Sequence, residues 1–529
     1  MDYTKRAALL CSTCCAILIV LSFIPPQRVL GVDLRRANIL SELLSFPADY
    51  YVEEIELVID DAEYEVDLES VAKEVVALER SEPLSQSSYA WHQDDPELLL
   101  DTLEEQQAVE PRREVAPLEK LLGGVATTPI ENFDTVELNS LRRLYQKLLS
   151  PDSLVRIAVM GDSFIEADIL TADLRESLQT LFGGCGSGFA PIASPLTQYR
   201  QTIKTQHKGW TSHNVMQRTK CPAPYSSLFS VAGWVNLPAV GATTTWSGTT
   251  SRSHLESCEC AKIHFVALND CELEVTINGS EPRTFSIEGG EGLRQIEIAQ
   301  SGIESLKLRV VSGQNGFVGY GAIFEGKEGV VVDNYSVRSN NGQAMFWTSA
   351  SINAQIDKAI GGYDMVILQY GLNIMQSGVN NYTRYAEQVE KMVAYAQQCF
   401  PRAAIVVMSV SDRSYKIDGT YRPMSEAVRL SEYQRSAAES MGVGFWSTYE
   451  AMQAQGGMSS FVSNGWAAKD FTHINFAGGR QVAWALVDAI IEGVEAERSR
   501  MVQRVEHEPV LDSLTREKLQ KDLFEAALQ

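Results

Sequence analysis

Basic residues are scarce in this sequence. Its 529 residues include 45 Lys and Arg against 68 Asp and Glu, so the formal net charge at pH 7 is −23. Nucleic-acid binding requires a basic surface that neutralises phosphates, and this deficit argues against that class of partner. The acidity is concentrated in residues 31–130, which hold 24 acidic and 7 basic residues. We expect an acidic, flexible spacer there, either a tether to a membrane or a linker that only adds solubility.

Paired metal-binding cysteines are also missing. Cys258 and Cys260 are separated by one residue, but no second pair accompanies them, so we expect no zinc site. Three of the nine cysteines lie in an N-terminal apolar run, and the others are Cys185, Cys221, Cys258, Cys260, Cys271 and Cys399. Because five of these six fall between residues 185 and 271, we expect one or two local disulfides in an exported protein, with no pairing assigned.

The N-terminus carries an apolar run with the layout of an export signal. Lys5 and Arg6 precede apolar residues 7–24, and two prolines follow. This order is typical of a signal peptide or an uncleaved signal anchor within residues 1–30. The run is at the short end for a membrane-spanning helix. We therefore expect export to the periplasm or cell envelope, and both cleavage and anchoring in the inner membrane stay open.

The segment from Val155 to Gly184 predicts a buried strand followed at once by a helix. Residues 155–160 are apolar and rich in β-branched side chains, as in parallel sheets. After Ser163 apolar residues recur at helical spacing, namely at Ile165, Ile169, Leu174, Leu178 and Leu181. A serine between strand and helix stands where open α/β sheets bind ligands. Ser163 or Asp162 could also be a simple helix cap.

An alternation of strands and helices resumes after residue 330. We expect strands at 330–337, 365–370, 404–410 and 443–446, and helices at 132–149, 382–399, 424–441 and 476–492. Together with the first strand, these make five parallel strands with crossover helices. The pattern predicts an α/β domain with a flavodoxin-like doubly wound sheet.

The interval between the first helix and the second strand is far too long for an ordinary connection, which takes two to six residues. It contains short alternating segments such as AKIHFVAL and CELEVTIN, separated by turn signals. These predict a β-sandwich or jelly roll inserted into the α/β domain. Its aromatic residues Trp210, Trp234, Trp246 and Tyr320 are candidates for stacking on sugar rings, although such residues usually belong to the core. The resulting division is 1–30, spacer 31–130, α/β domain 131–189 and 330–497, insertion 190–329, and a helical tail 498–529.

Four short motifs lie after predicted strands or before the last helix. They are Gly161-Asp162-Ser163, Ser339-Asn340-Asn341-Gly342, Gly371-Leu372-Asn373 and Asp470-Phe471-Thr472-His473. In a doubly wound sheet all of them converge at the carboxyl edge. In this order they resemble the SGNH (GDSL-type) hydrolase family over residues 153–183 and 330–492. The chain is most similar to the peptidoglycan O-acetylesterase branch, which carries a carbohydrate-binding-module-like insertion in this place.

The resemblance implies a role for each block. Ser163 would be the nucleophile, His473 the base that takes its proton, and Asp470 the group that orients the imidazole. The backbone N–H groups of Ser163 and Gly342 and the side-chain amide of Asn373 would stabilise the oxyanion. His473 is also the only histidine between His264 and His507.

Some residues depart from the family pattern or lie close to the nucleophile. Ile374 follows Asn373 where the family commonly has an aspartate, which puts the fine positioning of Asn373 in doubt. Asp162, Glu166 and Asp168 could line the pocket. The alternative for Glu166 and Asp168 is an acidic first helical turn, which the helix dipole favours.

The sequence therefore predicts an exported serine esterase that removes O-acetyl groups from a polysaccharide through an acyl-enzyme, without metal or nucleotide cofactor. By resemblance, acetylated peptidoglycan is the leading substrate. An O-acetyltransferase using the same residues, and a catalytically silent glycan-binding envelope protein, are the alternatives.

Overall fold

The structure is a computed structural model that describes residues 27–29, 32–34, 67–80, 88–92, 117–417 and 420–507. The chain divides into two compact units, residues 1–60 and 61–529. In the first unit, β1 (Gln27–Val29) pairs antiparallel with β2 (Val32–Leu34). The predicted signal segment 7–24 lies outside the described residues, as does the tail beyond residue 507. No helix within the described ranges has both the length and the apolar character needed to cross a membrane.

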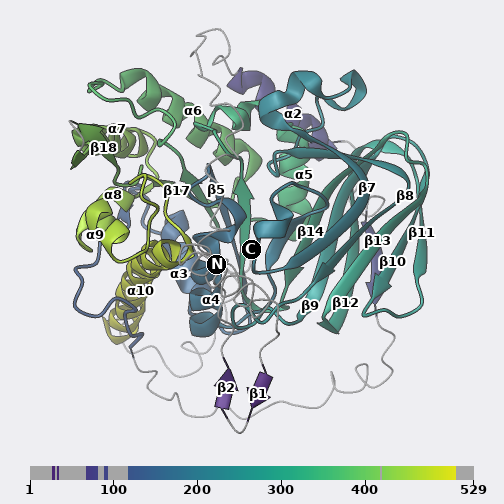
Figure 1. Ribbon diagram of the computed structural model, residues 1–529, viewed down its shortest axis with the longest axis horizontal. Helices are drawn as coiled ribbons and strands as arrows, with labels where there is room; N and C mark the ends of the chain where they lie inside the picture. Colours follow the sequence, from purple (N-terminus) through teal and green to yellow (C-terminus); the bar gives the residue numbers. More distant parts are fainter. Residues whose placement is uncertain are drawn as a thin grey trace, which may run out of the picture. The chain divides into compact units, whose positions relative to one another are not determined.

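A six-stranded sheet forms the centre of the second unit (Figure 1). Its strands are β4 (Glu131–Asn132), β5 (Leu154–Gly161), β15 (Gly329–Ser336), β16 (Met365–Gln369), β17 (Ala404–Met408) and β20 (Gly444–Trp446). The spatial order is β15-β5-β16-β17-β20-β4, and all neighbours are parallel except β20 and β4. Counted along the chain, the five parallel strands have the order 2-1-3-4-5, as in flavodoxin-like sheets. The predicted parallel α/β sheet is confirmed.

Helices cover both faces of this sheet. On one face α3 (Ser140–Leu148), α4 (Thr171–Phe182) and α10 (Phe476–His507) pack together, and on the other α5 (Ala350–Ile360), α6 (Thr383–Cys399) and α7 (Ser425–Ser440) do so (Figure 1). Two short helices, α8 (Thr448–Gln453) and α9 (Gly457–Ser463), follow β20. The predicted closing helix ends at residue 492, but α10 continues into the segment predicted as a separate tail.

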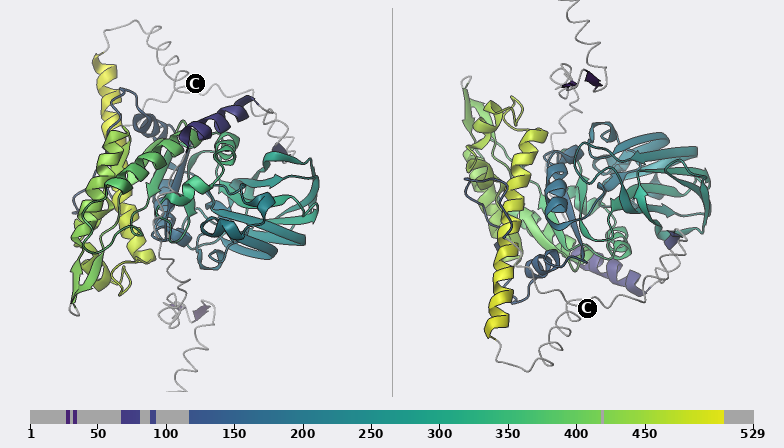
Figure 2. Two further views of the ribbon diagram at one scale, coloured as in Figure 1. Left: turned by 90° about the horizontal axis from the view of Figure 1, so that it is seen from above. Right: turned by 90° about the horizontal axis from the view of Figure 1, so that it is seen from below.

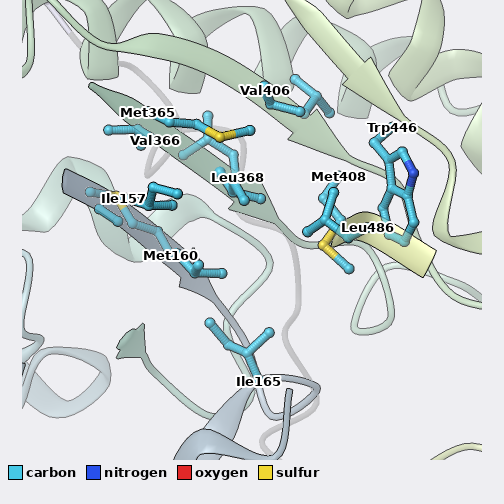
Figure 3. Packing of buried hydrophobic residues seen from close by; sticks show 14 of the residues in the cluster. Ile157, Met160, Ile165, Met365, Val366, Leu368, Val406, Met408, Trp446 and Leu486 are labelled. Carbon is cyan, nitrogen blue, oxygen red and sulfur yellow. The ribbon is translucent and has the colours of Figure 1, made fainter. Parts of the chain in front are cut away.

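The central strands are apolar on both faces because helices cover both. Figure 3 shows the consequence, with Ile157 and Met160 of β5 beside Leu368 of β16, and Met408 of β17 beside Trp446 of β20. Each of these side chains is buried. Burial of one such residue contributes roughly 1.5 to 3 kcal/mol. The rigid layer they form fixes where each strand ends, and those ends carry the candidate site.

A ten-stranded sheet holds the strands between α4 and β15, and β3 (Ser88–His92) joins its edge. The others are β6 (Gly188–Pro191), β7 (Lys204–Asn214), β8 (Trp234–Ser247), β9 (Cys258–Ala267), β10 (Cys271–Ile277), β11 (Arg283–Ile287), β12 (Gly290–Ile303), β13 (Ser305–Ser312) and β14 (Phe317–Glu325). In both views of Figure 2, α10 lies on the side of the unit away from these strands. That these strands form a separate inserted domain stays a prediction, because both sheets belong to one compact unit.

The predicted alternation of buried and exposed side chains in this sheet is confirmed. In β10, Leu273, Val275 and Ile277 are buried, whereas Glu272 is exposed and Glu274 and Thr276 are half-buried. The aromatic residues mostly serve this core. Trp246 and Tyr320 are fully buried, and Tyr320 donates its hydroxyl proton to Leu228 O at 2.7 Å. Two of the four sugar-stacking candidates are therefore core residues, and Trp210 and Trp234 are half-buried.

The expected local disulfides do not form. The described cysteines, residues 185, 221, 258, 260, 271 and 399, carry free thiols. Cys221 belongs to a different apolar cluster from Cys258 and Cys271, so closeness in sequence does not make it a partner of either. Burial raises the pKa of the Cys271 thiol to about 12, which keeps it protonated.

Parts of the predicted spacer are ordered. α2 (Leu68–Arg80) packs against α5 and α6, and β3 pairs in parallel with β12. Closer to the α/β domain, the N–H groups of Leu121 and Leu122 donate to the carboxylate of Asp488 in α10. Leu68, Val71 and Val75 place an apolar face of α2 against the core. The acidic composition of the segment led to the prediction of a flexible spacer, and the amphipathic pattern of this helix was overlooked.

The predicted helix over 132–149 is wrong in its first half. α3 begins at Ser140, where Asn139 Oδ1 caps it by accepting the N–H of Arg142 at 3.0 Å. Residues 131–132 form the edge strand β4 instead, and Leu138 is exposed. Asparagine is a favourable N-cap residue, so the helix begins directly after Asn139.

Candidate active site

The turn after β5 places Ser163 at the carboxyl edge of the sheet. A Cβ at Gly161 would lie 2.7 Å from Gln369 O of β16, so the close approach of the two strands requires glycine. Asp162 is fully buried, and its Oδ1 accepts the N–H of Phe164 at 2.9 Å. This bond closes a tight turn that presents Ser163, which is half-buried.

The helix does not begin directly after Ser163, contrary to the prediction. A short 3-10 helix, η4 (Glu166–Asp168), intervenes, and α4 starts only at Thr171, with no side-chain cap. Ala167 and Asp168 have φ values of 51° and 66°, in the left-handed region. Ser163 and Asp162 are therefore not caps of α4.

Asp168 is a buried residue whose carboxylate is held by neighbouring side chains. Its carboxylate is bound by Arg175 at 3.2 Å, by Arg200 at 2.8 Å and by Thr171 at 2.7 Å. Burial works to raise the pKa of Asp168, but the two guanidinium groups outweigh it and hold the pKa well below its usual range. Arg200 comes from the segment before β7, so no local sequence pattern could have predicted this conformation.

Glu166 is also engaged within the protein. It is buried, and its Oε2 accepts from Arg338 Nη2 at 2.5 Å. Arg338 follows β15, so this ion pair joins the segment after the nucleophile to the loop that contains Gly342. Glu166 precedes α4, so the acidic first turn that it forms with Asp168 belongs to the short helix η4.

Asp470 and His473 form a hydrogen-bonded pair before α10. His473 Nδ1 lies 2.7 Å from Asp470 Oδ2, and Asp470 Oδ1 accepts the N–H groups of Thr472 and His473 at 2.9 and 3.1 Å. Partial burial works to raise the pKa of Asp470, but the hydrogen bonds from His473 and Thr472 lower it to about 2. The side chains of His473 and Asp470 are 49% and 40% exposed, so solvent reaches the pair.

Asn373 follows β16 and lies beside the nucleophile turn. Its Nδ2 donates to Asp162 Oδ2 at 3.1 Å and to Asn340 O at 3.0 Å. Burial raises the pKa of Asp162 to about 7, and the bonds from Phe164 and Asn373 and the nearby His473 oppose this rise. Both amide hydrogens of Asn373 are thus engaged, and one must be exchanged for the oxyanion when substrate is bound.

Gly342 occupies the position predicted for a second donor. Its φ of 99° and the contact that a Cβ would make with Met392 Sδ exclude other residues. Its N–H donates to Asn340 Oδ1 at 2.9 Å. The oxyanion role of Gly342 therefore stays a prediction and requires this bond to open. Asn340 was missed as a site residue, although an Asn two residues before a Gly is a common turn signal.

The four motifs converge as predicted from the topology. Asn373 contacts both Asp162 and Asn340, which joins three of the loops. The fourth loop lies at the same edge, because Phe471 O accepts the N–H of Ser414, which follows the carboxyl end of β17, at 3.0 Å. The start of α10 also packs on the start of α4 through Arg480 and Asp173, 2.7 Å apart. Among the described residues no hydrogen bond joins Ser163 to His473, and no group of three His, Cys, Asp or Glu could hold a metal.

Comparison with known proteins supports the fold. Searches with protein-family models and against curated proteins find no match. A solved structure described as a peptidoglycan O-acetylesterase matches with a TM-score of 0.57 and 20% identity, covering 69% of this chain and 99% of the other. A family two carbohydrate esterase from Cellvibrio japonicus matches at 0.22 and 9%, covering 58% and 98%. A protein described as a GDSL-like lipase from Parabacteroides merdae matches at 0.24 and 16%, covering 31% and 74%.

Of these three structures, the O-acetylesterase alone has a TM-score above 0.5. This chain shares its fold. At 20% identity the likeness extends to the fold alone, and the chemistry must be argued from the site.

Proposed function

We propose that this protein is a serine esterase that removes O-acetyl groups from a polysaccharide, with Ser163 as nucleophile. The observation that carries the proposal is the His473–Asp470 pair at 2.7 Å, placed at the same sheet edge as the Gly161-Asp162-Ser163 turn. The shared fold with an O-acetylesterase supports the same reaction class.

The proposed reaction has two steps. Ser163 Oγ attacks the acetyl carbonyl carbon while His473 Nε2 takes its proton, and Asp470 stabilises the imidazolium through Nδ1. The tetrahedral intermediate collapses, the bond to the sugar oxygen breaks, and His473 returns the proton to that oxygen. Water then attacks the acetyl-enzyme with the same base and releases acetate. The backbone N–H of Ser163 and the Asn373 amide would stabilise the oxyanion in both steps.

The exposure of the base favours hydrolysis over transfer to a sugar hydroxyl. A transferase must keep water away from the acyl-enzyme. Here nearly half of the His473 side chain is open to solvent, so water can resolve the intermediate. A protein that only binds glycans does not need all of Ser163, Asp470 and His473 together with Asn373. The presence of the complete set therefore argues against that alternative.

Peptidoglycan as substrate, and export to the periplasm or cell envelope, belong to the same proposal. The sequence resemblance and the name of the matching structure support the substrate. The basic and apolar pattern of residues 5–24 supports export, with or without retention in the membrane.

Acetate release tests this proposal. The full chain is incubated with 4-nitrophenyl acetate and with O-acetylated peptidoglycan, beside Ser163→Ala and the matched control Ser280→Ala in an exposed turn of the ten-stranded sheet. We expect release from both substrates with the wild type and the control, and none above background with Ser163→Ala.

Two results would contradict parts of the proposal. Ser163-dependent release from the small ester alone would exclude peptidoglycan and keep the esterase. No Ser163-dependent release from either substrate by folded protein would exclude the esterase.

A further inference from the structure

A β-hairpin that the sequence analysis did not predict lies against the loop from Asp470 to His473, called the acid–base loop below. It consists of β18 (Ser414–Ile417) and β19 (Thr420–Pro423), which pair antiparallel from Ser414 with Pro423 to Ile417 with Thr420. The hairpin connects β17 to α7 and therefore starts at the carboxyl edge of the sheet, where the candidate site lies (Figure 1).

The hairpin contacts the two residues between Asp470 and His473. The N–H of Ser414 donates to Phe471 O at 3.0 Å. The ring of Tyr421 stacks on the ring of Phe471, with centroids 3.9 Å apart and planes inclined by 16°. Just before β18, Arg413 Nε donates to Thr472 Oγ1 at 3.1 Å. Each residue that links the acid to the base is thus held from outside the loop.

The loop needs such support because its conformation is strained. Phe471 has a φ of 57°, a left-handed conformation that costs a non-glycine residue on the order of 1 kcal/mol or more. This conformation lets one carboxylate accept from both Thr472 N and His473 N while its second oxygen meets the imidazole. Asp470 and His473 are exposed, so burial of their own side chains contributes little to holding them.

Contacts within the loop also support it, and one of them is the N–H of Phe471, which donates to Ala468 O at 3.1 Å. The N–H of Ala468 donates to His473 O at 2.8 Å, and Ala467 forms a β-bridge with Ile474. These bonds hold the ends of the loop and the N–H of Phe471, but none of them holds the Phe471 side chain. The stacked ring of Tyr421 opposes rotation of the Phe471 side chain, and with it relaxation of the backbone.

We propose that the β18–β19 hairpin is a positioning element of the active site, in which Tyr421, through Phe471, and Arg413, through Thr472, hold His473 in line with Ser163. This inference rests on the proposed esterase function for its kinetic consequence. Its structural consequence, the integrity of the His473–Asp470 bond, does not depend on that function. Tyr421 and Arg413 are positioning residues, since neither touches the reacting atoms.

The test compares Tyr421→Ala with Tyr421→Phe, which keeps the stacked ring. The control is Arg422→Ala, an exposed neighbour whose side chain points to the opposite face of the strand. With 4-nitrophenyl acetate we expect Tyr421→Ala to lower kcat roughly ten- to a hundredfold, as for a misplaced catalytic group, with KM within about twofold of the wild type. Tyr421→Phe and Arg422→Ala should keep the wild-type kcat.

A second measurement needs no catalysis. In ¹⁵N-histidine-labelled full chain, the proton on His473 Nδ1, assigned with His473→Gln, should give a low-field resonance because it is shared with Asp470. We expect this resonance to be lost in Tyr421→Ala and retained in Tyr421→Phe. If Tyr421→Ala does not fold, Arg413→Gln takes its place in the test. This variant removes an independent contact and should weaken the resonance.

The outcomes separate the two proposals. Unchanged kcat and an unchanged resonance in both Tyr421→Ala and Arg413→Gln would overturn the positioning role. Loss of the resonance in a protein without any Ser163-dependent esterase activity would support the positioning role and overturn the esterase.

Discussion

Asn373 shows how a single side chain connects three loops of the site. It donates to Asp162 after β5 and to the Asn340 carbonyl after β15, and it lies in the loop that follows β16. Its amide is therefore a structural bond in the resting protein and, by our proposal, a donor to the oxyanion during turnover. The two roles use the same hydrogens, so substrate binding must replace at least one of these bonds.

We expect Asn373→Ala to lower kcat/KM for 4-nitrophenyl acetate about a hundredfold, because one preorganised oxyanion donor contributes roughly 3 kcal/mol. The measurement is steady-state hydrolysis at constant pH. Asn380→Ala is the matched control, since Asn380 is exposed a few residues further along the same loop. A decrease of less than about threefold in Asn373→Ala would exclude this residue as a donor.

At the scale of single residues, the sequence predicted which motifs of the candidate site lie together, but it did not predict all of the hydrogen bonds and ion pairs that their residues form. Asp470 and His473 are three residues apart and could be paired from the sequence. The ion pair of Asp168 with Arg200 crosses 32 positions and belongs to two elements, so no local pattern contained it. Ala167 and Asp168 have left-handed φ values in this conformation, and α4 starts only after them.

At the scale of elements, predicted strands agree with the structure within about two residues at each end, because runs of β-branched residues are buried on both faces. Missed elements had signals that the hydrophobic pattern alone did not use. α5 begins after the cap Ser349 and ends at Gly361, which is left-handed, and both residue types mark helix ends. The β18–β19 hairpin is linked by Asp418-Gly419, a strong hairpin sequence.

Strand β9 carries a prediction about pH. His264 is buried, and burial lowers its pKa to about 4, aided by Lys262 and Arg156, while Gln295 and Glu325 act in the opposite direction. The unfolded chain binds this proton near pH 6.5, so below that value protonation favours unfolding. The stability contributed by neutral His264 is therefore full above pH 6.5 and is lost as the pH falls towards 4, by as much as roughly 3 kcal/mol.

Urea unfolding of the wild type and His264→Gln at pH 7.5 and pH 5 measures this effect. The wild type should lose more stability between these two values than the variant, whose side chain does not titrate. His207→Gln on the exposed strand β7 is the control and should follow the wild type. Equal losses in wild type and His264→Gln would show that other groups dominate the acid response.

At the scale of the whole second unit, the two sheets are joined by a buried ion pair. Arg156 of β5 binds Glu325 of β14 through two hydrogen bonds, one of 2.8 Å, and Lys262 of β9 binds the same carboxylate at 2.8 Å. Burial works to raise the pKa of Glu325, but Arg156 and Lys262 outweigh it and lower the pKa. Two cations and one carboxylate thus meet across the boundary between the sheets.

We expect Glu325→Gln to reduce the free energy of unfolding by about 3 to 5 kcal/mol, because it leaves two buried cations without a partner. Glu274→Gln is the control, since it breaks an ion pair with Arg309 that is partly open to solvent and should cost at most about 1 kcal/mol. The measurement is urea denaturation followed by tryptophan fluorescence. Similar losses for both variants would mean that the buried pair does not couple the sheets.

The long interval between β5 and β15 has a consequence for chain entropy. These two strands pair in register from Leu154 with Gly329 to Gly161 with Ser336, and nearly all of the ten-stranded sheet lies between them in the chain. A flexible loop of that length would make their pairing expensive. However, β6 near the start of the interval pairs with β14 at its end, so these two strands bring distant parts of the interval together. The pairing of β6 with β14 thus shortens the effective loop between the turn of Ser163 and the loop of Gly342. The long interval therefore adds little to the entropic cost of pairing β5 with β15.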